Sequence, residues 1–169
     1  MAAIFLIGYM GSGKSTVGKR LAKKLNFNFI DLDSFIEEEN KLTISEIFTK
    51  LGENEFRALE HNALKKLISN THTVISCGGG TPCYYNNIEL MNNNGITIYI
   101  KMSIDTLAQR LFNAKQKRPL VANLSTITEL KKIINEQLEK REAFYQQAQY
   151  TVKGKNLNLN ELALFIENK

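Results

Sequence analysis

The 169-residue sequence lacks the long apolar runs, the linkers and the repeats that mark membrane or multidomain proteins. No apolar run approaches the roughly 18–20 residues that cross a membrane, so we expect no membrane partner. The run at residues 3–7 is too short for the core of a signal peptide, and we therefore expect a cytoplasmic protein. Two prolines occur, and there is no internal repeat, low-complexity tract or linker. These absences predict one domain over residues 1–169.

Cysteine and clustered charge are also scarce. Cys77 and Cys83 flank a glycine run without the spacing of zinc ligands, which favours free thiols. The net charge is +5, but the basic residues are dispersed, and the one tight cluster lies at residues 115–118. This distribution favours a site for anions, such as nucleotide phosphates and an acidic substrate, over a nucleic-acid surface. We therefore expect no nucleic-acid partner.

The strongest motif that is present begins at Gly8 and reads GYMGSGKST. It fits G-x-x-x-x-G-K-[ST], the phosphate-binding loop (P-loop). The glycines permit backbone angles that a Cβ would block, so that backbone N–H groups can surround an anion. Lys14 can reach the β- and γ-phosphates, and the Ser15 hydroxyl can bind Mg²⁺.

The flanking sequence supports this interpretation. Residues 3–7 form an apolar run typical of a buried strand, and Val17, Leu21 and Leu25 recur every four residues. A helix that begins near Lys14 would add its N-terminal dipole to the site. A dinucleotide-binding fingerprint does not fit, because position 16 is Thr16 instead of glycine.

Short apolar runs alternate with helical patterns along the chain. This alternation predicts a parallel α/β sheet with right-handed crossovers. The expected strands are residues 3–7, 27–31, 73–76, 96–100 and 150–152. The expected helices begin near residues 14, 34, 44, 86, 103, 127 and 159, with a capping box at Thr43 and a break at Gly52.

Carboxylates follow the second expected strand in Asp31-Leu32-Asp33. Residues two apart in a strand share a face, so both side chains can lie at the carboxyl edge of the sheet, where open α/β sheets bind ligands. Asp33 is alternatively the N-cap of the next helix. The two roles can coexist.

Three further segments carry candidate site residues. Arg57 and Glu60 lie three apart on an expected helix and can pair, and a surface ion pair is the simpler interpretation. The glycines at 78–80 predict close backbone contact with a ligand, or else a tight strand-to-helix turn. Residues 114–125 have weak periodicity and include Arg118 and Pro119. They are a lid candidate, or else a solvated basic loop.

Six residue groups occur together in one order and spacing. They are the P-loop, Asp31-Leu32-Asp33, Phe56-Arg57-x-x-Glu60, Gly78-Gly79-Gly80, Arg118-Pro119-Leu120 and Arg141-x-x-x-Tyr145. The combination resembles the shikimate kinase family through nearly the whole chain. The P-loop alone is generic, but gluconate, adenylate and other small P-loop kinases do not share the other five groups.

This resemblance implies a three-layer α/β/α P-loop kinase fold. The five-stranded parallel sheet would have the order 2-3-1-4-5, with an acceptor-binding segment at about residues 32–60 and a mobile lid at about 114–125. The activity would be ATP-dependent phosphorylation of the shikimate 3-hydroxyl in the chorismate and aromatic amino acid pathway, with Mg²⁺ as cofactor. We expect a monomer.

The resemblance also implies the site residues. Lys14, Asp33 and Arg118 would be catalytic, and Ser15 and Asp31 would hold the metal, Asp31 through water. ATP would contact Gly11, Ser12, Gly13, Lys14, Ser15, Thr16, Arg110 near the adenine and Arg118 from the lid. Shikimate would contact Asp33, Arg57, Gly78, Gly79, Gly80 and Arg141.

The chemistry of these residue types agrees with such a substrate. Shikimate has one carboxylate, which suits the planar guanidinium groups of Arg57 and Arg141. Ionised Asp33 can only accept, which suits a hydroxyl group, and it can orient that nucleophile or take its proton. Another small-molecule kinase, such as a gluconate kinase, and a non-catalytic nucleotide- or RNA-binding module remain alternatives. Intact Lys14, Ser15 and Asp33 argue against the latter.

Overall fold

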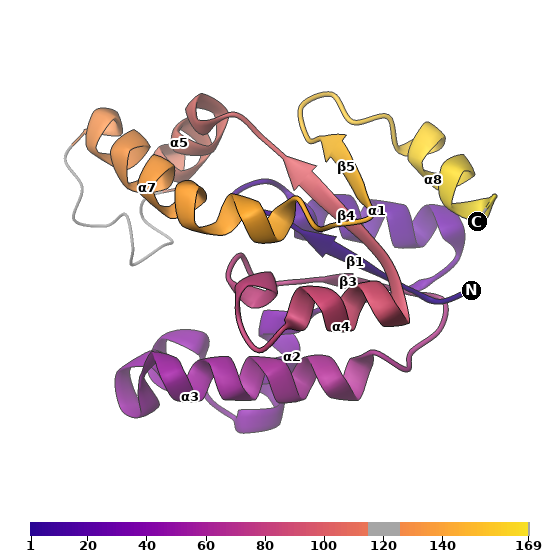
Figure 1. The fold of residues 1–169 in the computed structure, drawn as a ribbon, viewed down its shortest axis with the longest axis horizontal. Helices are drawn as coiled ribbons and strands as arrows, with labels where there is room; N and C mark the ends of the chain where they lie inside the picture. Colours follow the sequence, from indigo (N-terminus) through magenta and orange to yellow (C-terminus); the bar gives the residue numbers. More distant parts are fainter. Residues whose placement is uncertain (115–125, 169) are drawn as a thin grey trace.

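The computed structural model describes residues 1–114 and 126–168. Its centre is a parallel sheet in which all neighbouring strands run in one direction (Figure 1). The five strands lie in the order β2-β3-β1-β4-β5. Their bounds are β1 (Ala3–Ile7), β2 (Asn28–Asp31), β3 (Thr73–Ser76), β4 (Gly95–Lys101) and β5 (Tyr150–Lys153). The parallel sheet and its 2-3-1-4-5 order confirm the expected fold.

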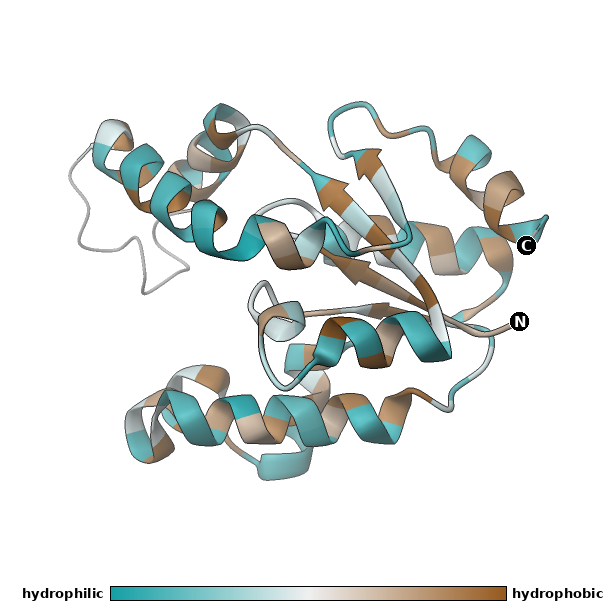
Figure 2. Ribbon diagram, in the orientation of Figure 1, coloured by the Kyte–Doolittle hydropathy of each residue, from teal (hydrophilic) through white to brown (hydrophobic). Residues whose placement is uncertain are grey.

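Strand β1 is buried on both faces because it lies in the middle of the sheet. Ala3, Phe5 and Ile7 contribute to one apolar cluster, whereas Ile4 and Leu6 contribute to a second. Successive side chains of a strand point to opposite faces, so an uninterrupted apolar run supplies both. Figure 2 shows this hydrophobic centre between more polar outer helix surfaces.

Helices cover both faces of the sheet and complete the three layers (Figure 1). The core residues of α1 (Lys14–Leu25) and α8 (Leu159–Glu167) belong to the cluster on one face. The other cluster includes α2 (Leu32–Asn40), α3 (Ile44–Leu67), α4 (Asn87–Asn94), α5 (Ile104–Asn113) and α7 (Ile127–Tyr145). None of the helices that the structure describes is long and apolar enough to span a membrane.

Local sequence signals account for several helix boundaries. Thr43 and Glu46 form the expected capping box at the start of α3. Gly52 adopts φ 83° and ψ 170°, so the helical backbone breaks there although α3 continues beyond it. A second capping box, between Thr126 and Glu129, begins α7. That second box was visible as T-x-x-E in the sequence but was not among our expectations.

Candidate active site

The P-loop joins β1 to α1 at the carboxyl edge of the sheet. Gly11 and Gly13 have φ angles of 80° and 93°, which residues with a Cβ rarely adopt. Gly13 is the N-cap of α1, and no side chain caps the first N–H groups of this helix. These donors and the helix dipole therefore form the anion-binding geometry that the motif predicted.

The Lys14 side chain is folded back over the loop. Its Nζ donates hydrogen bonds to the carbonyl oxygens of Gly8 at 2.8 Å and Tyr9 at 2.9 Å. The residue is 8% exposed, so the ammonium group lies at the floor of the cleft and not in bulk solvent. In this position it can attract phosphate oxygens while the loop carbonyls hold it in place.

Oxygen atoms suited to a hard cation gather beside Lys14. The Ser15 hydroxyl donates to Asp31 Oδ2 at 2.6 Å and lies 3.1 Å from the Ser76 hydroxyl. Mg²⁺ in phosphate-transfer sites is bound by one or two carboxylates together with substrate phosphates and water. Ser15 and Asp31 therefore fit the metal role that the resemblance implied.

The structure corrects our account of the second carboxylate. Strand β2 ends at Asp31, and α2 begins at Leu32, so Asp33 lies in the first helical turn and the strand-periodicity argument was wrong. Asp31 is the N-cap, accepting from the Ser34 N–H at 3.4 Å, so the N-cap alternative for Asp33 was also wrong. Asp33 nevertheless reaches the same cleft as Asp31.

Burial controls the ionisation of Asp33. Burial, which is the largest cause, and the negative charges of Asp31 and Glu60 raise the pKa of Asp33, the positive charge of Lys14 lowers it, and the net result is a rise from 3.8 to about 6. A carboxyl group with a pKa near 6 is mostly ionised at neutral pH but holds a proton more readily than an ordinary aspartate. This is the ionisation behaviour expected of a group that accepts a proton from a hydroxyl nucleophile.

One cleft of about 400 Å³ collects most of the expected phosphate and metal residues. Its volume is in the range of small-ligand pockets. From the expected set it is lined by Gly11, Gly13, Lys14, Ser15, Thr16, Asp31, Asp33, Gly78, Gly79 and Arg110. Arg110 donates to the carbonyl oxygen of Gly11 at 3.2 Å, which places this guanidinium over the P-loop.

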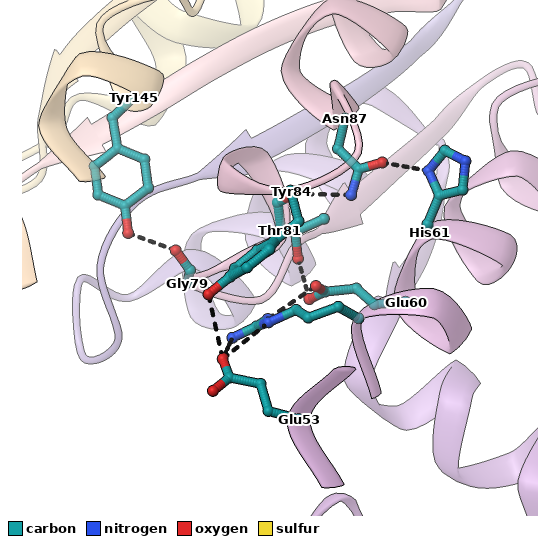
Figure 3. A network of polar contacts seen from close by, with 9 residues as sticks. Glu53, Glu60, His61, Gly79, Thr81, Tyr84, Asn87 and Tyr145 are labelled. Atoms are coloured by element: carbon teal, nitrogen blue, oxygen red, sulfur yellow. Dashed lines mark hydrogen bonds and ion pairs between the residues drawn. The ribbon is translucent and has the colours of Figure 1, made fainter. Parts of the chain in front are cut away.

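Arg57 and Glu60 form an ion pair as expected, but the pair is not at the surface. Arg57 Nη1 donates to Glu60 Oε2 at 2.9 Å, and the two side chains are 9% and 1% exposed. The Thr81 hydroxyl donates to the other Glu60 oxygen at 2.5 Å (Figure 3). Burial lowers the pKa of Arg57, but the charge and hydrogen bond of Glu60 outweigh this effect and raise it. A surface pair was therefore the wrong interpretation.

The glycine run lies against the two arginines that were expected to bind the acceptor. A Cβ on Gly80 would lie 2.6 Å from Arg57 Nη1, and one on Gly79 would lie 3.5 Å from Arg141 Nη1. A side chain at Gly80 would displace the guanidinium. The Tyr145 hydroxyl donates to the carbonyl oxygen of Gly79 at 2.5 Å and holds this loop against α7 (Figure 3).

Some expected residues lie outside the cleft lining. Ser12 is buried, its N–H donates to the Tyr9 carbonyl oxygen at 3.2 Å, and its hydroxyl has no hydrogen-bond partner among the residues that the structure describes. Arg57, Gly80 and Arg141 border the cleft through the glycine loop and do not line it. Arg118 and positions 115–125 of the expected lid lie outside the described residues.

Sequence reasoning missed aromatic residues that hold the arginines. The Tyr84 ring lies 4.4 Å from the Arg57 guanidinium carbon, and the Phe56 ring lies 5.0 Å from it. Arg141 lies 5.8 Å from the ring of Tyr9. Tyr9 occupies a variable position of the loop motif, and Tyr84 follows the glycine run without periodicity, so no local signal indicated either contact.

Comparison with known proteins identifies one family over nearly the whole chain. A family model described as shikimate kinase matches residues 10–167. A shikimate kinase of Azobacteroides pseudotrichonymphae genomovar. CFP2 is 47% identical over 169 residues, which cover 99% of this chain and 97% of that protein.

Solved structures give the same result. The crystal structure of shikimate kinase from Bacteroides thetaiotaomicron has a TM-score of 0.90 at 43% identity, covering 99% of this chain and 97% of that one. Shikimate kinase from Acinetobacter baumannii in complex with shikimate has a TM-score of 0.86 at 32% identity, covering 100% and 95%.

These similarities extend over both halves of the site, from the P-loop to the Arg141 helix. The family model and the relatives agree with the motif combination in the sequence and with the sheet order in the structure. The chain therefore belongs to the shikimate kinase family of ATP-dependent kinases.

Proposed function

We propose that this chain transfers the γ-phosphoryl group of ATP to the 3-hydroxyl of shikimate, giving shikimate 3-phosphate for chorismate and aromatic amino acid synthesis. The observation that carries this proposal is the placement of Lys14, Ser15 and Asp33 around one cleft, with the Arg57 and Arg141 guanidinium groups held at its border by the glycine loop. Membership of the family supports it, and disfavours both alternatives raised from the sequence.

In the proposed reaction Asp33 accepts the hydrogen bond of the attacking hydroxyl group and takes its proton as the new P–O bond forms and the bond between the γ-phosphorus and ADP breaks. Its pKa of about 6 leaves it ionised and able to accept at neutral pH. Lys14 stabilises the charge that spreads over the transferred group. Phosphoryl transfer depends mainly on such positioning and charge neutralisation.

The acceptor carboxylate is proposed to bind Arg57 and Arg141, with the backbone at Gly78, Gly79 and Gly80 in contact with the ring. Two guanidinium groups beside the glycine loop suit a planar anion. A substrate held at its carboxylate presents a fixed hydroxyl group to Asp33. This fixed geometry would supply much of the rate through orientation.

The phosphate side is proposed to use the backbone of Gly11, Ser12, Gly13 and Thr16 as anion donors. Mg²⁺ bound near Ser15 and Asp31 would neutralise phosphate charge. Arg110 would lie near the adenine, and its hydrogen bond to the Gly11 carbonyl oxygen at the lining of the cleft supports this place. Arg118, in the proposed lid at residues 114–125, would contact the transferred phosphate; its positive charge in a basic segment supports this role.

We further propose a single-domain monomer that works in the cytoplasm, where ATP is available, without a nucleic-acid or membrane partner. The charge of the site residues supports small anions as partners: Lys14, Arg57, Arg110 and Arg141 all lie in or beside the cleft. Size-exclusion chromatography with light scattering tests the monomer, and a binding assay with RNA across salt concentrations tests the absence of nucleic-acid binding.

The central experiment measures ADP release with shikimate, gluconate and nucleoside monophosphates as acceptors. Turnover should depend on shikimate. Arg141→Ala should weaken shikimate binding and leave ATP binding nearly unchanged, because loss of a charge-assisted hydrogen bond costs roughly 1.5–3 kcal/mol. Arg20→Ala is the matched control, because Arg20 is an exposed residue of α1 that does not line the cleft. Turnover with gluconate alone would contradict the assignment.

A further inference from the structure

The Arg57 guanidinium forms ion pairs with two carboxylates, those of Glu60 and Glu53. Besides its bond to Glu60, Nη2 and Nε donate to the same oxygen of Glu53, at 3.2 and 3.4 Å. The Glu60 side chain is 1% exposed, whereas that of Glu53 is 55% exposed. One of these partners is therefore fixed inside the protein, and the other reaches Arg57 from the surface.

This arrangement opposes the binding of an anion. Glu60 already balances the single positive charge of Arg57, so Glu53 adds an excess negative charge at the group proposed to hold the acceptor carboxylate. The carboxylate of Asp33 lies close to that of Glu60, because a Cβ on Gly78 would be 3.1 Å from Asp33 Oδ1 and 2.9 Å from Glu60 Oε1. These nearby negative charges disfavour the binding of a further carboxylate at Arg57.

Glu53 is the partner that can leave. Glu60 is held by burial and by the Thr81 hydroxyl, and removing it would leave a buried cation unpaired. Glu53 follows Gly52, where the backbone of α3 breaks at φ 83° and ψ 170°. A Cβ on Gly52 would meet nothing within 4 Å, so this glycine serves backbone conformation and not close packing.

The remaining contact of Glu53 is also at the surface. The Tyr84 hydroxyl, on a residue that is 37% exposed, donates to the same Glu53 oxygen at 3.2 Å (Figure 3). All three hydrogen bonds thus converge on one carboxylate oxygen at 3.2–3.4 Å. A ligand carboxylate that used both of its oxygens on the guanidinium edge would make shorter and stronger bonds.

We propose that Glu53 occupies the carboxylate-binding edge of Arg57 in the empty enzyme and that the acceptor carboxylate displaces it, so that Glu53 sets the affinity for anionic acceptors. This inference rests on the proposed function, because it takes Arg57 as a group that binds the acceptor carboxylate. Glu53 acts through Arg57 and Tyr84. An acceptor without the charge gains little from displacing it, which makes Glu53 a specificity-determining residue.

The test uses Glu53→Gln, which keeps a side-chain oxygen that can accept from Arg57 but removes the negative charge. Glu55→Gln is the matched control, because it makes the same charge change on an exposed side chain two residues further along α3. With ATP saturating, the KM for shikimate should fall roughly two- to fivefold in Glu53→Gln, the scale of a partly exposed ion pair. The kcat should change less than about twofold, and Glu55→Gln should match wild type.

A neutral acceptor separates competition from a general effect on the fold. The carboxamide of shikimate keeps the three hydroxyl groups without the charge, and its KM should be the same in wild type and Glu53→Gln. Isothermal titration calorimetry of shikimate, in the absence of nucleotide, should show the same tightening as the KM. Thermal unfolding of each variant checks that the fold is intact.

The opposite results overturn the inference. A higher KM in Glu53→Gln would show that Glu53 positions Arg57 for the acceptor, and an unchanged KM would show that it does not compete. An equal gain for the carboxamide would mean that charge is not the cause. If wild type shows no shikimate-dependent turnover, the proposed function fails by itself; calorimetry with shikimate still decides whether Glu53 opposes binding.

Discussion

The Tyr9 hydroxyl donates to Gln137 Oε1 at 2.8 Å, which joins the P-loop directly to α7. Helix α7 also carries Arg141, whose guanidinium lies 5.8 Å from the Tyr9 ring. This hydrogen bond therefore links the two sides of the cleft that we propose to bind the phosphates and the acceptor. Through it the position of the loop is coupled to the position of an arginine proposed to bind the acceptor.

Tyr9→Phe removes this hydrogen bond and keeps an aromatic ring near Arg141. The net value of such a bond is about 0.5–1.5 kcal/mol, so we expect the KM for shikimate to rise about two- to tenfold. Gln137→Leu should have the same effect, and the double variant should resemble either single one, as measured by steady-state kinetics. Additive effects of the two substitutions would show that the coupling is absent.

Lys14→Ala tests whether the positive charge of Lys14 contributes to the rate of phosphoryl transfer. Removal of one preorganised charge costs on the order of 10²–10³ in rate, and the loss should appear in kcat. The fold should remain, because the Nζ hydrogen bonds of Lys14 go to carbonyl oxygens of the loop itself. Lys19→Ala, on the exposed side of α1, is the control. Near-normal turnover of folded Lys14→Ala would remove this residue from the mechanism.

Asp33→Asn should lower the rate by about 10²–10⁴ if this carboxylate takes the proton of the acceptor. In wild type, kcat/KM should decrease as the pH falls through about 6, where Asp33 becomes protonated. A pH–rate profile measured with shikimate limiting checks both points. A profile that stays flat through this range would contradict a role for ionised Asp33.

Asp33→Asn should lower the rate but raise the stability of the fold at neutral pH. A pKa raised from 3.8 to about 6 means that the contribution of Asp33 to stability is present below pH 3.8 and is lost as the pH rises through about 6. Asp33→Asn should therefore unfold at a higher temperature than wild type at pH 7–8, and this difference should disappear below pH 3.8. Calorimetric melts at both pH values decide this.

Glu60→Gln tests the buried ion pair. It leaves Arg57 charged, 9% exposed and without its inner carboxylate, a change that typically costs about 3–5 kcal/mol of unfolding free energy. Glu39→Gln breaks the exposed pair with Lys66 and should cost at most about 1 kcal/mol. Urea unfolding of the two variants gives the comparison. Similar losses in both would mean that burial adds nothing to the Arg57–Glu60 pair.

Arg118→Ala tests the proposed lid residue. If its guanidinium stabilises the transferred phosphate, kcat should fall by about 10²–10³ while the shikimate dissociation constant changes much less. Lys115→Ala removes a neighbouring positive charge and is the control. Stopped-flow turnover and equilibrium titration measure the two quantities separately. Weaker shikimate binding at unchanged kcat would place Arg118 on the acceptor side.

Residue patterns were sufficient for the parallel α/β sheet and for the strand–loop–helix context of the P-loop, whereas the strand order came from the family resemblance. Uninterrupted apolar runs such as residues 3–7 indicate buried parallel strands, and the P-loop is continuous in the chain, so its geometry is largely local. The motif combination added the acceptor side by resemblance. Each of these signals depends on the spacing of residues along the chain, which can be read directly from the sequence.

Features set by tertiary contacts could not be found in this way. The spacing of Arg57 and Glu60 showed that they can pair, but their burial depends on Thr81 and Tyr84, which lie in a segment distant along the chain. The boundary between β2 and α2 was misplaced because Asp31 ends a strand and caps a helix at once. Periodicity cannot identify a residue that performs both roles.

The direction of β1 has a practical consequence for handling the protein. The amino terminus and α8 lie on one side of the molecule. The carboxyl-terminal end of α5 and the amino-terminal end of α7 lie on the opposite side (Figure 1). Strand β1 spans five residues at about 3.3 Å each, so about 17 Å separates its beginning from the P-loop at its end. A tether attached at Met1 should therefore orient the open cleft away from a biosensor surface and leave both substrates free to enter.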